Sequence, residues 1–249
     1  MLDDAPPQLP LWSDAATAEA WAVRESRRAR RLAVRVFHTG RVEIVVPRRT
    51  SRRVIAQFVD GHREWIEAKL AQARRRAATA EPFPPRTIAL AACGQSWRVH
   101  LAGGSGAVRA RSIAPGILAL VGDVCDTGLA QRALRAWLGE RARAALVPAL
   151  TECAQALGYA YRRVAIRRQR TRWGSCSARG TISLNSCLMF QAPEVVRYLL
   201  VHELVHTCHM NHSRAFWQQV SQHCPHYRRL DAELVDGWRR VPSWVFGAV

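Results

Sequence analysis

Two histidines four residues apart, with a glutamate directly after the first, constrain this chain more than any other feature. They form the segment His202-Glu203-Leu204-Val205-His206. On an α-helix, residues four apart lie on one face, about 6 Å apart along the axis, so two imidazole nitrogens can reach one metal ion at roughly 2 Å. Glu203 is offset by about 100° around the helix, which places its carboxylate beside that ion. The segment therefore predicts a zinc-binding helix with an adjacent base.

Two further histidines, His209 and His212, follow this segment. In a continued helix, His202 and His209 would be about 10 Å apart along the axis, too far to share one ion, so His209 is the poorer candidate for a third ligand. We expect the helix to end just after His206, with Asn211 in the left-handed conformation that ends helices. His212 then returns to the metal.

Ser213 is placed to cap a second helix, from Arg214 to Val220. A serine side chain accepts a hydrogen bond from a free backbone N–H of the first helical turn, which is why it favours this position. Phe216 and Trp217 of this helix can then form a wall of the metal site.

The ligand set of three histidines leaves one position of a four-coordinate zinc open, which is typical of catalytic zinc sites. Zinc would lower the pKa of a bound water, Glu203 would take its proton, and the hydroxide would attack a carbonyl carbon. Hydrolysis of a peptide bond is the expected reaction. Glu233 and Asp236 are alternative third ligands, but His212 fits better because a short turn brings it back.

Further blocks with a fixed order surround the histidines: Arg172-Trp173-Gly174-Ser175-Cys176-Ser177, Ile182-Ser183-Leu184-Asn185, Tyr198 to His206 and Asn211 to Trp217. Together they resemble the YgjP-like zinc metallopeptidases, which are related to the SprT and WLM metalloproteases of the zincin type. The resemblance extends more weakly upstream and covers about residues 24–238. It implies zinc on His202, His206 and His212, with Glu203 catalytic. The alternative metzincin pattern is rejected, because it requires a glycine where His209 stands.

Apolar periodicity predicts an α+β protein. A hairpin is expected from the alternating residues of Leu32–Val36 and Val42–Val46, and a helix from Ser51 to about Leu70, weakened in its middle by Gly61. Short strands without a helix are expected from Thr87 to Val121.

The second half is expected to begin with a helix from about Thr127 to Leu157, in which Pro148 is a kink or a break. Strands around Val164-Ala165-Ile166 and Thr181–Leu184 then precede the metal helix, which starts at Pro193.

These elements suggest four parts. They are a disordered amino-terminal tail (1–23), a β-rich region with one helix (24–125), a zincin-like metallopeptidase core with the active-site helix beside a small β-sheet (126–240), and a carboxy-terminal tail (241–249).

Substrate contacts are harder to derive from the sequence. Four residues are candidates for the substrate cleft: Trp173, Ser175, Asn185 and Trp217. A strand beside the metal helix would let a peptide bind as an added strand. Cys176 is interpreted as an inert thiol in a buried turn and not as a nucleophile. An oxyanion donor from His223, His226 or Tyr227 stays open, since surface roles fit these residues equally well.

The composition of the chain indicates the cellular compartment in which it works. The chain has 249 residues, 49% of them hydrophobic, which is enough for a substantial core. Its acidic, proline-rich start lacks the features of a signal peptide, and no segment reaches the roughly 18 apolar residues of a membrane helix. Seven cysteines without a Cys-x-x-Cys pair favour a reducing compartment. We expect a cytoplasmic protein that does not bind membranes, and the oligomeric state stays open.

The chain carries 37 basic and 19 acidic residues, a formal charge of +18. The excess is concentrated between Arg24 and Arg76 and in the arginines from 162 to 172. Such surfaces attract nucleic acid or acidic proteins. An arginine-rich composition explains the same excess without a partner, and no base-recognition motif decides between the two interpretations.

Two functions from different classes follow from these features. The first is a zinc-dependent peptidase in which Glu203 activates water, with a DNA-associated protease acting on DNA-bound proteins as a sharper version. The second is a non-catalytic module that binds zinc and nucleic acid. Glu203 discriminates between them, because a structural zinc has no use for a carboxylate at this position.

Overall fold

The structure is a computed structural model that describes residues 21–27, 29–37, 40–78 and 82–246. The chain forms two compact units, one up to Ala80 and the other from Glu81 to Ala248. The boundary expected from the sequence, at residue 125, differs from this division. The strands between residues 87 and 122 belong to the second unit because they pack on its long helix, as shown below.

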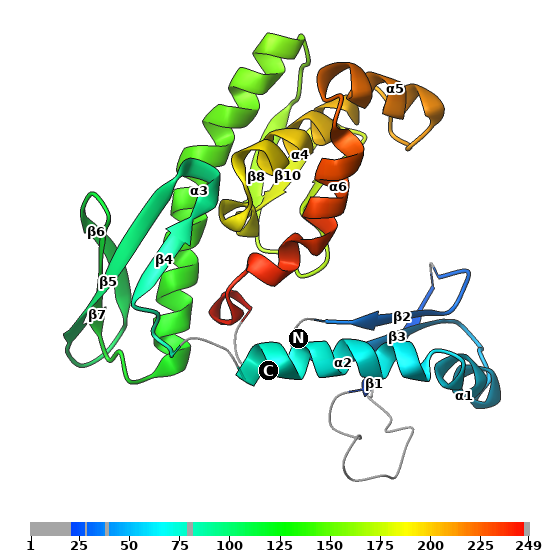
Figure 1. Ribbon diagram of the computed structural model, residues 1–249, viewed down its shortest axis with the longest axis horizontal. Helices are drawn as coiled ribbons and strands as arrows, with labels where there is room; N and C mark the ends of the chain where they lie inside the picture. Colours follow the sequence, from blue (N-terminus) through cyan, green and yellow to red (C-terminus); the bar gives the residue numbers. More distant parts are fainter. Residues whose placement is uncertain (1–20, 28, 38–39, 79–81, 247–249) are drawn as a thin grey trace, which may run out of the picture. The chain divides into compact units, whose positions relative to one another are not determined.

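The first unit contains a three-stranded sheet and two helices (Figure 1). Strands β1 (Trp21–Ser26), β2 (Ala33–Val36) and β3 (Val42–Pro47) are ordered β1-β3-β2. β2 and β3 are antiparallel, which confirms the predicted hairpin. β1 runs parallel to β3, so Trp21–Val23 are part of the sheet and not of the expected tail. Residues 1–20 of that tail lie outside the described residues.

The helical segment of the first unit consists of α1 (Arg52–Asp60) and α2 (Arg63–Ala78). The prediction of one helix is therefore wrong, and the break falls at Gly61, the residue with the lowest helix propensity in the segment. Ser51 caps α1 as expected, since its Oγ accepts a hydrogen bond from the Val54 N–H at 3.4 Å. Apolar residues of both helices pack on β3 in one small core: Val42, Ile44, Val46, Ile55, Val59 and Ile66.

The second unit begins with a four-stranded sheet, which confirms the predicted β section. Its strands are β4 (Thr87–Leu90), β5 (Gln95–Gly103), β6 (Arg109–Ala114) and β7 (Ile117–Gly122), in the order β4-β5-β7-β6. β5 and β7 are parallel, and the other two pairs are antiparallel. A short 3-10 turn, η1 (Ala91–Cys93), lies between β4 and β5 and was not expected.

Helix α3 (Thr127–Leu157) packs along this sheet. Asp126 caps its start, and Gly158 ends it in the left-handed conformation. Pro148 lies within the helix without dividing it. Trp137 of α3 packs edge-on against Trp97 of β5, and its indole N–H donates to Ser112 Oγ of β6 at 3.1 Å. These contacts place the sheet and the helix in one core.

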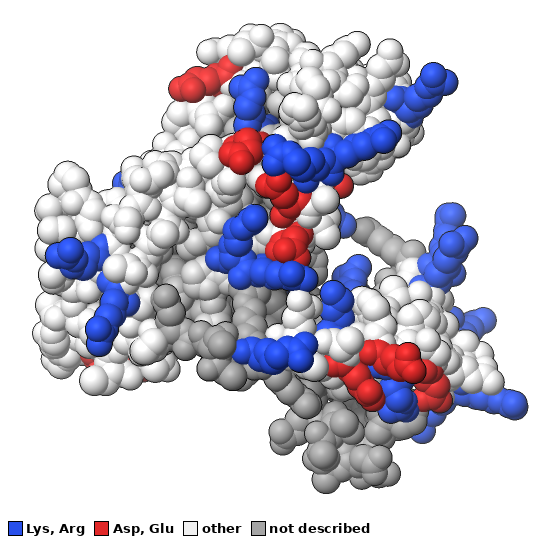
Figure 2. Space-filling view, viewed as in Figure 1, with Lys and Arg blue, Asp and Glu red and all other residues white. Residues whose placement is uncertain are grey.

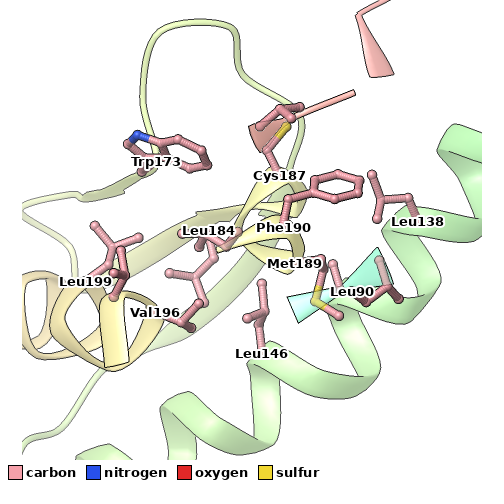
Figure 3. Packing of buried hydrophobic residues seen from close by; sticks show 14 of the residues in the cluster. Leu90, Leu138, Leu146, Trp173, Leu184, Cys187, Met189, Phe190, Val196 and Leu199 are labelled. Carbon is pink, nitrogen blue, oxygen red and sulfur yellow. The ribbon is translucent and has the colours of Figure 1, made fainter. Parts of the chain in front are cut away.

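The metal-binding half consists of a small sheet followed by helices. β8 (Arg163–Arg167), β9 (Gly174–Cys176) and β10 (Thr181–Asn185) are ordered β8-β10-β9. The 3-10 helix η2 (Ser186–Phe190) fills the space beside α3: in Figure 3, Phe190 points towards Leu138 and Met189 lies beside Leu90 of β4. The helices are α4 (Pro193–Val205), α5 (Arg214–His223) and α6 (Tyr227–Asp236).

Two short 3-10 helices, η3 (Gly237–Arg240) and η4 (Ser243–Val245), follow α6. Trp244, Val245 and Phe246 are buried, so this part of the expected carboxy-terminal tail belongs to the core. Their backbone carbonyls accept hydrogen bonds from the guanidinium groups of three arginines: Arg135, Arg168 and Arg170. Two of the six arginines between residues 162 and 172, Arg168 and Arg170, therefore hold the end of the described chain in place.

The α+β class predicted from the sequence is confirmed by the three small sheets and the helices around them. No described helix combines the length and the apolar composition that crossing a bilayer requires.

Candidate metal centre

Helix α4 carries the first two histidines and is buried along most of its length. Pro193 opens it at a position where a missing N–H costs nothing, and Glu194 follows in the first turn, where negative charge is favourable. His206 is the C-cap, directly after the last helical residue Val205, so the helix ends where the ligand geometry required.

The turn after α4 is formed differently from the prediction. The left-handed conformation expected at Asn211 is wrong, since Arg49 is the only non-glycine residue with a positive φ in the described chain. Instead, the Thr207 hydroxyl donates to the carbonyl of Leu204 at 2.7 Å, and the His209 N–H donates to that of Val205. These bonds satisfy free carbonyls at the helix end without a left-handed residue.

The chain then enters α5 as predicted. Ser213 caps this helix, its Oγ accepting from the Phe216 N–H at 3.4 Å. His212 stands directly before the cap, so the start of α5 fixes its position. The geometry brings His212 to the two histidines of α4.

The Nε2 atoms of His202, His206 and His212 lie 3.2 Å from one another in all three pairings. Tetrahedral zinc with Zn–N bonds of about 2.0–2.1 Å separates its nitrogen ligands by about 3.3 Å. The donor set thus fits a zinc ion without rearrangement. In the described chain, these three residues are the one group of histidine, cysteine or acidic side chains that can hold a metal.

Hydrogen bonds and burial prepare these histidines for a cation. His206 Nδ1 lies 2.9 Å from the backbone carbonyl of His209, so Nδ1 carries the proton and the Nε2 lone pair faces the cluster. Burial, followed by the nearby His206 and His212, lowers the pKa of His202 to about 3. Burial also lowers the pKa of His206. Neutral imidazoles are the form that binds a metal.

His209 itself points away from the cluster. Its Nε2 lies 2.8 Å from Gln219 Oε1 of α5, while its backbone carbonyl orients His206. The alternative ligands are engaged elsewhere as well, because Glu233 pairs with Arg229 and Asp236 pairs with Arg239.

Aromatic side chains of α5 surround the histidines. The Phe216 ring is buried with its centroid 4.5 Å from that of His206. The Trp217 ring stacks on His212 at 5.5 Å and on Tyr227 at 5.2 Å. Phe216 and Trp217 therefore line the site as the sequence suggested, and Tyr227 packs on the Trp217 ring. His212 is exposed, so the cluster is open to solvent on its side.

Glu203 lies between the helix and strand β9 and is only 3% exposed. A Cβ atom added at Gly174 would lie 2.5 Å from Glu203 Oε1, so the carboxylate occupies the space that any other side chain at 174 would fill. Burial raises the pKa of Glu203 to about 8, against the opposing effect of Arg172. Its Oε2 has no hydrogen-bond partner among the described residues. An unpaired buried carboxylate oxygen is a costly arrangement that suggests a role in chemistry.

β9 is the edge strand of its sheet, since β10 alone pairs with it among the described strands. Asn185 N donates to Trp173 O, and Ser177 N donates to Thr181 O. The hydrogen-bonded positions of β9 therefore alternate with Gly174 and Cys176, whose backbone groups point away from β10. These groups form an open edge beside Glu203.

The four cleft candidates differ in placement. Trp173 is buried and stacks on Trp238 with the centroids 4.0 Å apart. Ser175 is partly buried on β9, and Trp217 lies against His212 as described.

Asn185, the remaining cleft candidate, is fully buried, and its side chain connects separate backbone segments by hydrogen bonds. Its Nδ2 donates to the carbonyls of Gln169 and Arg172, both at 2.7 Å, and its Oδ1 accepts from the Cys187 N–H. These bonds fix the loop that leads into β9. All polar groups of this side chain serve the fold, which argues for a structural role.

Cys176 lies on strand β9 and is partly buried, so the buried turn expected for it is wrong. Burial and the charge of Glu203 raise the pKa of its thiol to about 11. A thiol in that state is a poor nucleophile. His223, one of the suggested oxyanion donors, lies 3.2 Å from the hydroxyl of Tyr159.

Comparisons with known proteins place this geometry in context. A family model described as the YgjP-like metallopeptidase domain matches residues 30–236. No curated protein matches the chain. Among solved structures, the chain is similar to the zymogen of abylysin, a metallopeptidase of Pyrococcus abyssi, with 25% identity over 39% of this chain and 98% of that one, at a TM-score of 0.35. It is also similar to the zymogen of Methanocaldococcus jannaschii jannalysin, with 17% identity over 36% and 94% and a TM-score of 0.33.

We expect the purified chain to bind one Zn²⁺ per molecule and His206→Ala to weaken this binding by more than about 100-fold, since one of three ligands is lost. Equilibrium dialysis or competition with a chromogenic chelator measures the affinity. His223→Ala is the matched control, because this histidine lies outside the cluster against Tyr159. Equal zinc affinity in wild type and His206→Ala would contradict the assignment.

Proposed function

This chain belongs to the YgjP-like metallopeptidase family, and we propose that it is a zinc-dependent peptidase in which Glu203 is the general base. The observation that carries the proposal is the convergence of three Nε2 atoms at 3.2 Å beside a buried, unpaired carboxylate oxygen. His202, His206 and His212 are the proposed ligands.

A bound zinc ion supplies two effects, a lower pKa of coordinated water and polarisation of the scissile carbonyl. The three imidazoles hold the ion from one side and leave the solvent-exposed side of His212 for water and substrate. Phe216 keeps the His206 ring in place and shields it from water.

Glu203 takes the proton of the attacking water and passes it to the departing amine. Its neighbour on the helix is His202, and its carboxylate is held against Gly174 with Oε2 unpaired. A base that is already oriented loses little entropy when the reaction starts, which favours catalysis.

The open edge of β9 is the proposed binding site for the peptide backbone. Gly174 and Cys176 present backbone N–H and C=O groups there, so an extended peptide can pair with them as an added strand. Such pairing would place the substrate backbone beside Glu203, which lies against the same strand. Ser175 and Trp217 remain the proposed side-chain contacts.

Cytoplasmic localisation remains a proposal. All seven cysteines are free thiols, which is typical of proteins in a reducing compartment.

A nucleic-acid-binding role is the second candidate, as a non-catalytic module or as a protease acting on DNA-bound proteins. Basic side chains are spread over the face seen in Figure 2, and those over α6 lie beside acidic ones. On the four-stranded sheet, however, Arg98, Arg109 and Arg111 are exposed and have no ion pair among the described residues. Strand alternation and register place them on one sheet face. Phosphate groups are the chemistry that such a face attracts.

Glu203→Gln tests the role of the carboxylate. We expect kcat to fall by roughly 10²–10⁴-fold with zinc retained, because the amide keeps the shape of the side chain and cannot take a proton. Cleavage of an unbiased peptide library, paired with metal analysis, measures both quantities. His206→Ala should lose both zinc and activity. Equal peptidase rates in wild type and Glu203→Gln would remove the enzymatic proposal.

Gly174→Ala tests the contact between β9 and Glu203. The added methyl group must displace the carboxylate, so we expect kcat to fall about tenfold or more while the zinc content stays unchanged. Gly139→Ala is the control, because a Cβ atom there has nothing within 4 Å. The same change at that helical position should stabilise the protein by about 1 kcal/mol and leave kcat alone. An unaffected kcat in Gly174→Ala would show that the carboxylate position is unimportant.

The nucleic-acid candidate is tested with a labelled DNA duplex at several salt concentrations. We expect binding that weakens steeply with salt, and a slope of log K against log salt that is smaller by about 2 in the Arg109→Gln/Arg111→Gln variant. Arg63→Gln is the control, since this arginine is exposed but paired with Asp60 at 2.7 Å. For the protease version, cleavage of a DNA-bound protein should rise when DNA is added. A weak DNA affinity that changes neither with salt concentration nor with the double substitution would reject this candidate.

A further inference from the structure

Tyr198 lies one helical turn before His202, on the same face of α4. The tyrosine is fully buried, and its hydroxyl oxygen is 3.4 Å from His202 Nδ1. The two rings meet edge to face, with centroids 5.9 Å apart. The hydroxyl therefore faces the ring nitrogen that points away from the metal cluster.

Asp231 of α6 completes this arrangement from the other side. The Tyr198 hydroxyl donates to Asp231 Oδ1 at 2.7 Å, a short and strong hydrogen bond. A phenol has only one proton, so its oxygen is left as an acceptor towards His202. His202 can satisfy that acceptor only when Nδ1 carries the proton, which leaves the lone pair on Nε2.

We propose that Asp231 and Tyr198 form a positioning relay that holds His202 in the Nδ1–H tautomer with Nε2 directed at the metal. The inference rests on the proposed zinc site and deepens it, since it names two residues that tune the affinity of that site. Neither residue is among the proposed metal ligands.

The relay gives His202 the kind of support that His206 receives from a backbone carbonyl. His206 Nδ1 is fixed by the carbonyl of His209 at 2.9 Å. His202 lies inside α4, where the backbone carbonyls already accept hydrogen bonds from the N–H groups four residues on. The Tyr198 hydroxyl, one turn earlier, is the acceptor available to His202 Nδ1. Asp231 accepts the hydroxyl proton, which leaves the hydroxyl oxygen free to accept from His202.

The chain offers a matched control for a purely structural tyrosine. Tyr159 also bonds a histidine, its hydroxyl lying 3.2 Å from His223 Nε2, with the rings edge to face at 5.6 Å. This pair has the same two residue types and lies outside the metal cluster. Loss of its hydroxyl should affect stability without affecting zinc.

The test measures the affinity for Zn²⁺ alone by chelator competition in wild type, Tyr198→Phe, Asp231→Ala and Tyr159→Phe. We expect Tyr198→Phe and Asp231→Ala each to weaken zinc binding by about 10–100-fold, as is typical for the loss of an outer-shell partner. Tyr159→Phe should keep wild-type affinity. Asp231→Asn should restore much of the affinity lost in Asp231→Ala, because the amide oxygen still accepts from Tyr198.

A double-substitution cycle separates a relay from two independent effects. If the aspartate acts through the tyrosine, Tyr198→Phe/Asp231→Ala should bind zinc as Tyr198→Phe does, with no further loss. The visible spectrum of bound Co²⁺ should change in Tyr198→Phe and stay the same in Tyr159→Phe, since only the former reorients a ligand.

Several outcomes would overturn the relay. They are wild-type zinc affinity in Tyr198→Phe, an equal loss in Tyr159→Phe, or additive losses in the double variant. If Tyr198→Phe does not fold, Asp231→Ala and Asp231→Asn decide the question, because Asp231 is only half-buried and its replacement disturbs the core less. A protein that binds no zinc in any form would instead reject the proposed function, so the two failures are distinguishable.

Discussion

Three imidazole nitrogens that meet at 3.2 Å are the constraint on which the arrangement of the second unit depends. Two of them lie one helical turn apart, which places both side chains on the same face of α4. The third requires that helix to end at His206 and the next to begin at Ser213, so that a turn of fixed length returns His212. Helices α3, α5 and α6 and strand β9 pack on α4 and bury it, which keeps the donor set assembled.

The sequence alone predicted the parts of this centre that depend on local geometry. Helical spacing pointed to His202 and His206, and the cap at Ser213 followed from residue type. Long-range pairing was harder: β1 was missed because its partner β3 runs parallel to it about twenty residues later, and parallel pairing leaves no hairpin signal. The left-handed Asn211 was wrong because a threonine hydroxyl and backbone bonds satisfied the helix end in another way. Local propensity could not reveal which of these solutions the chain uses.

Other features of the site depend on contacts that no spacing rule contains. Asn185 resembled a cleft residue by its neighbours in the sequence, whereas its amide holds the loop before β9. Tyr198 carried a usable signal, since it precedes His202 by one turn. Asp231 carried none, because it reaches the site through the packing of α6 on α4. Arginines near β8 suggested an anionic partner, yet Arg168 and Arg170 bind backbone carbonyls of the last described residues.

The absence of a side chain at Gly174 links two events that are usually treated separately. The strand proposed to pair with a peptide, β9, is the same strand that confines the Glu203 carboxylate, with no space between them. Any outward movement of β9 during docking therefore changes the freedom of the proton acceptor. Under the proposed function, selectivity for a peptide and the rate of its cleavage depend on the same contact, so a poorly placed peptide would be cleaved slowly even when it is bound tightly.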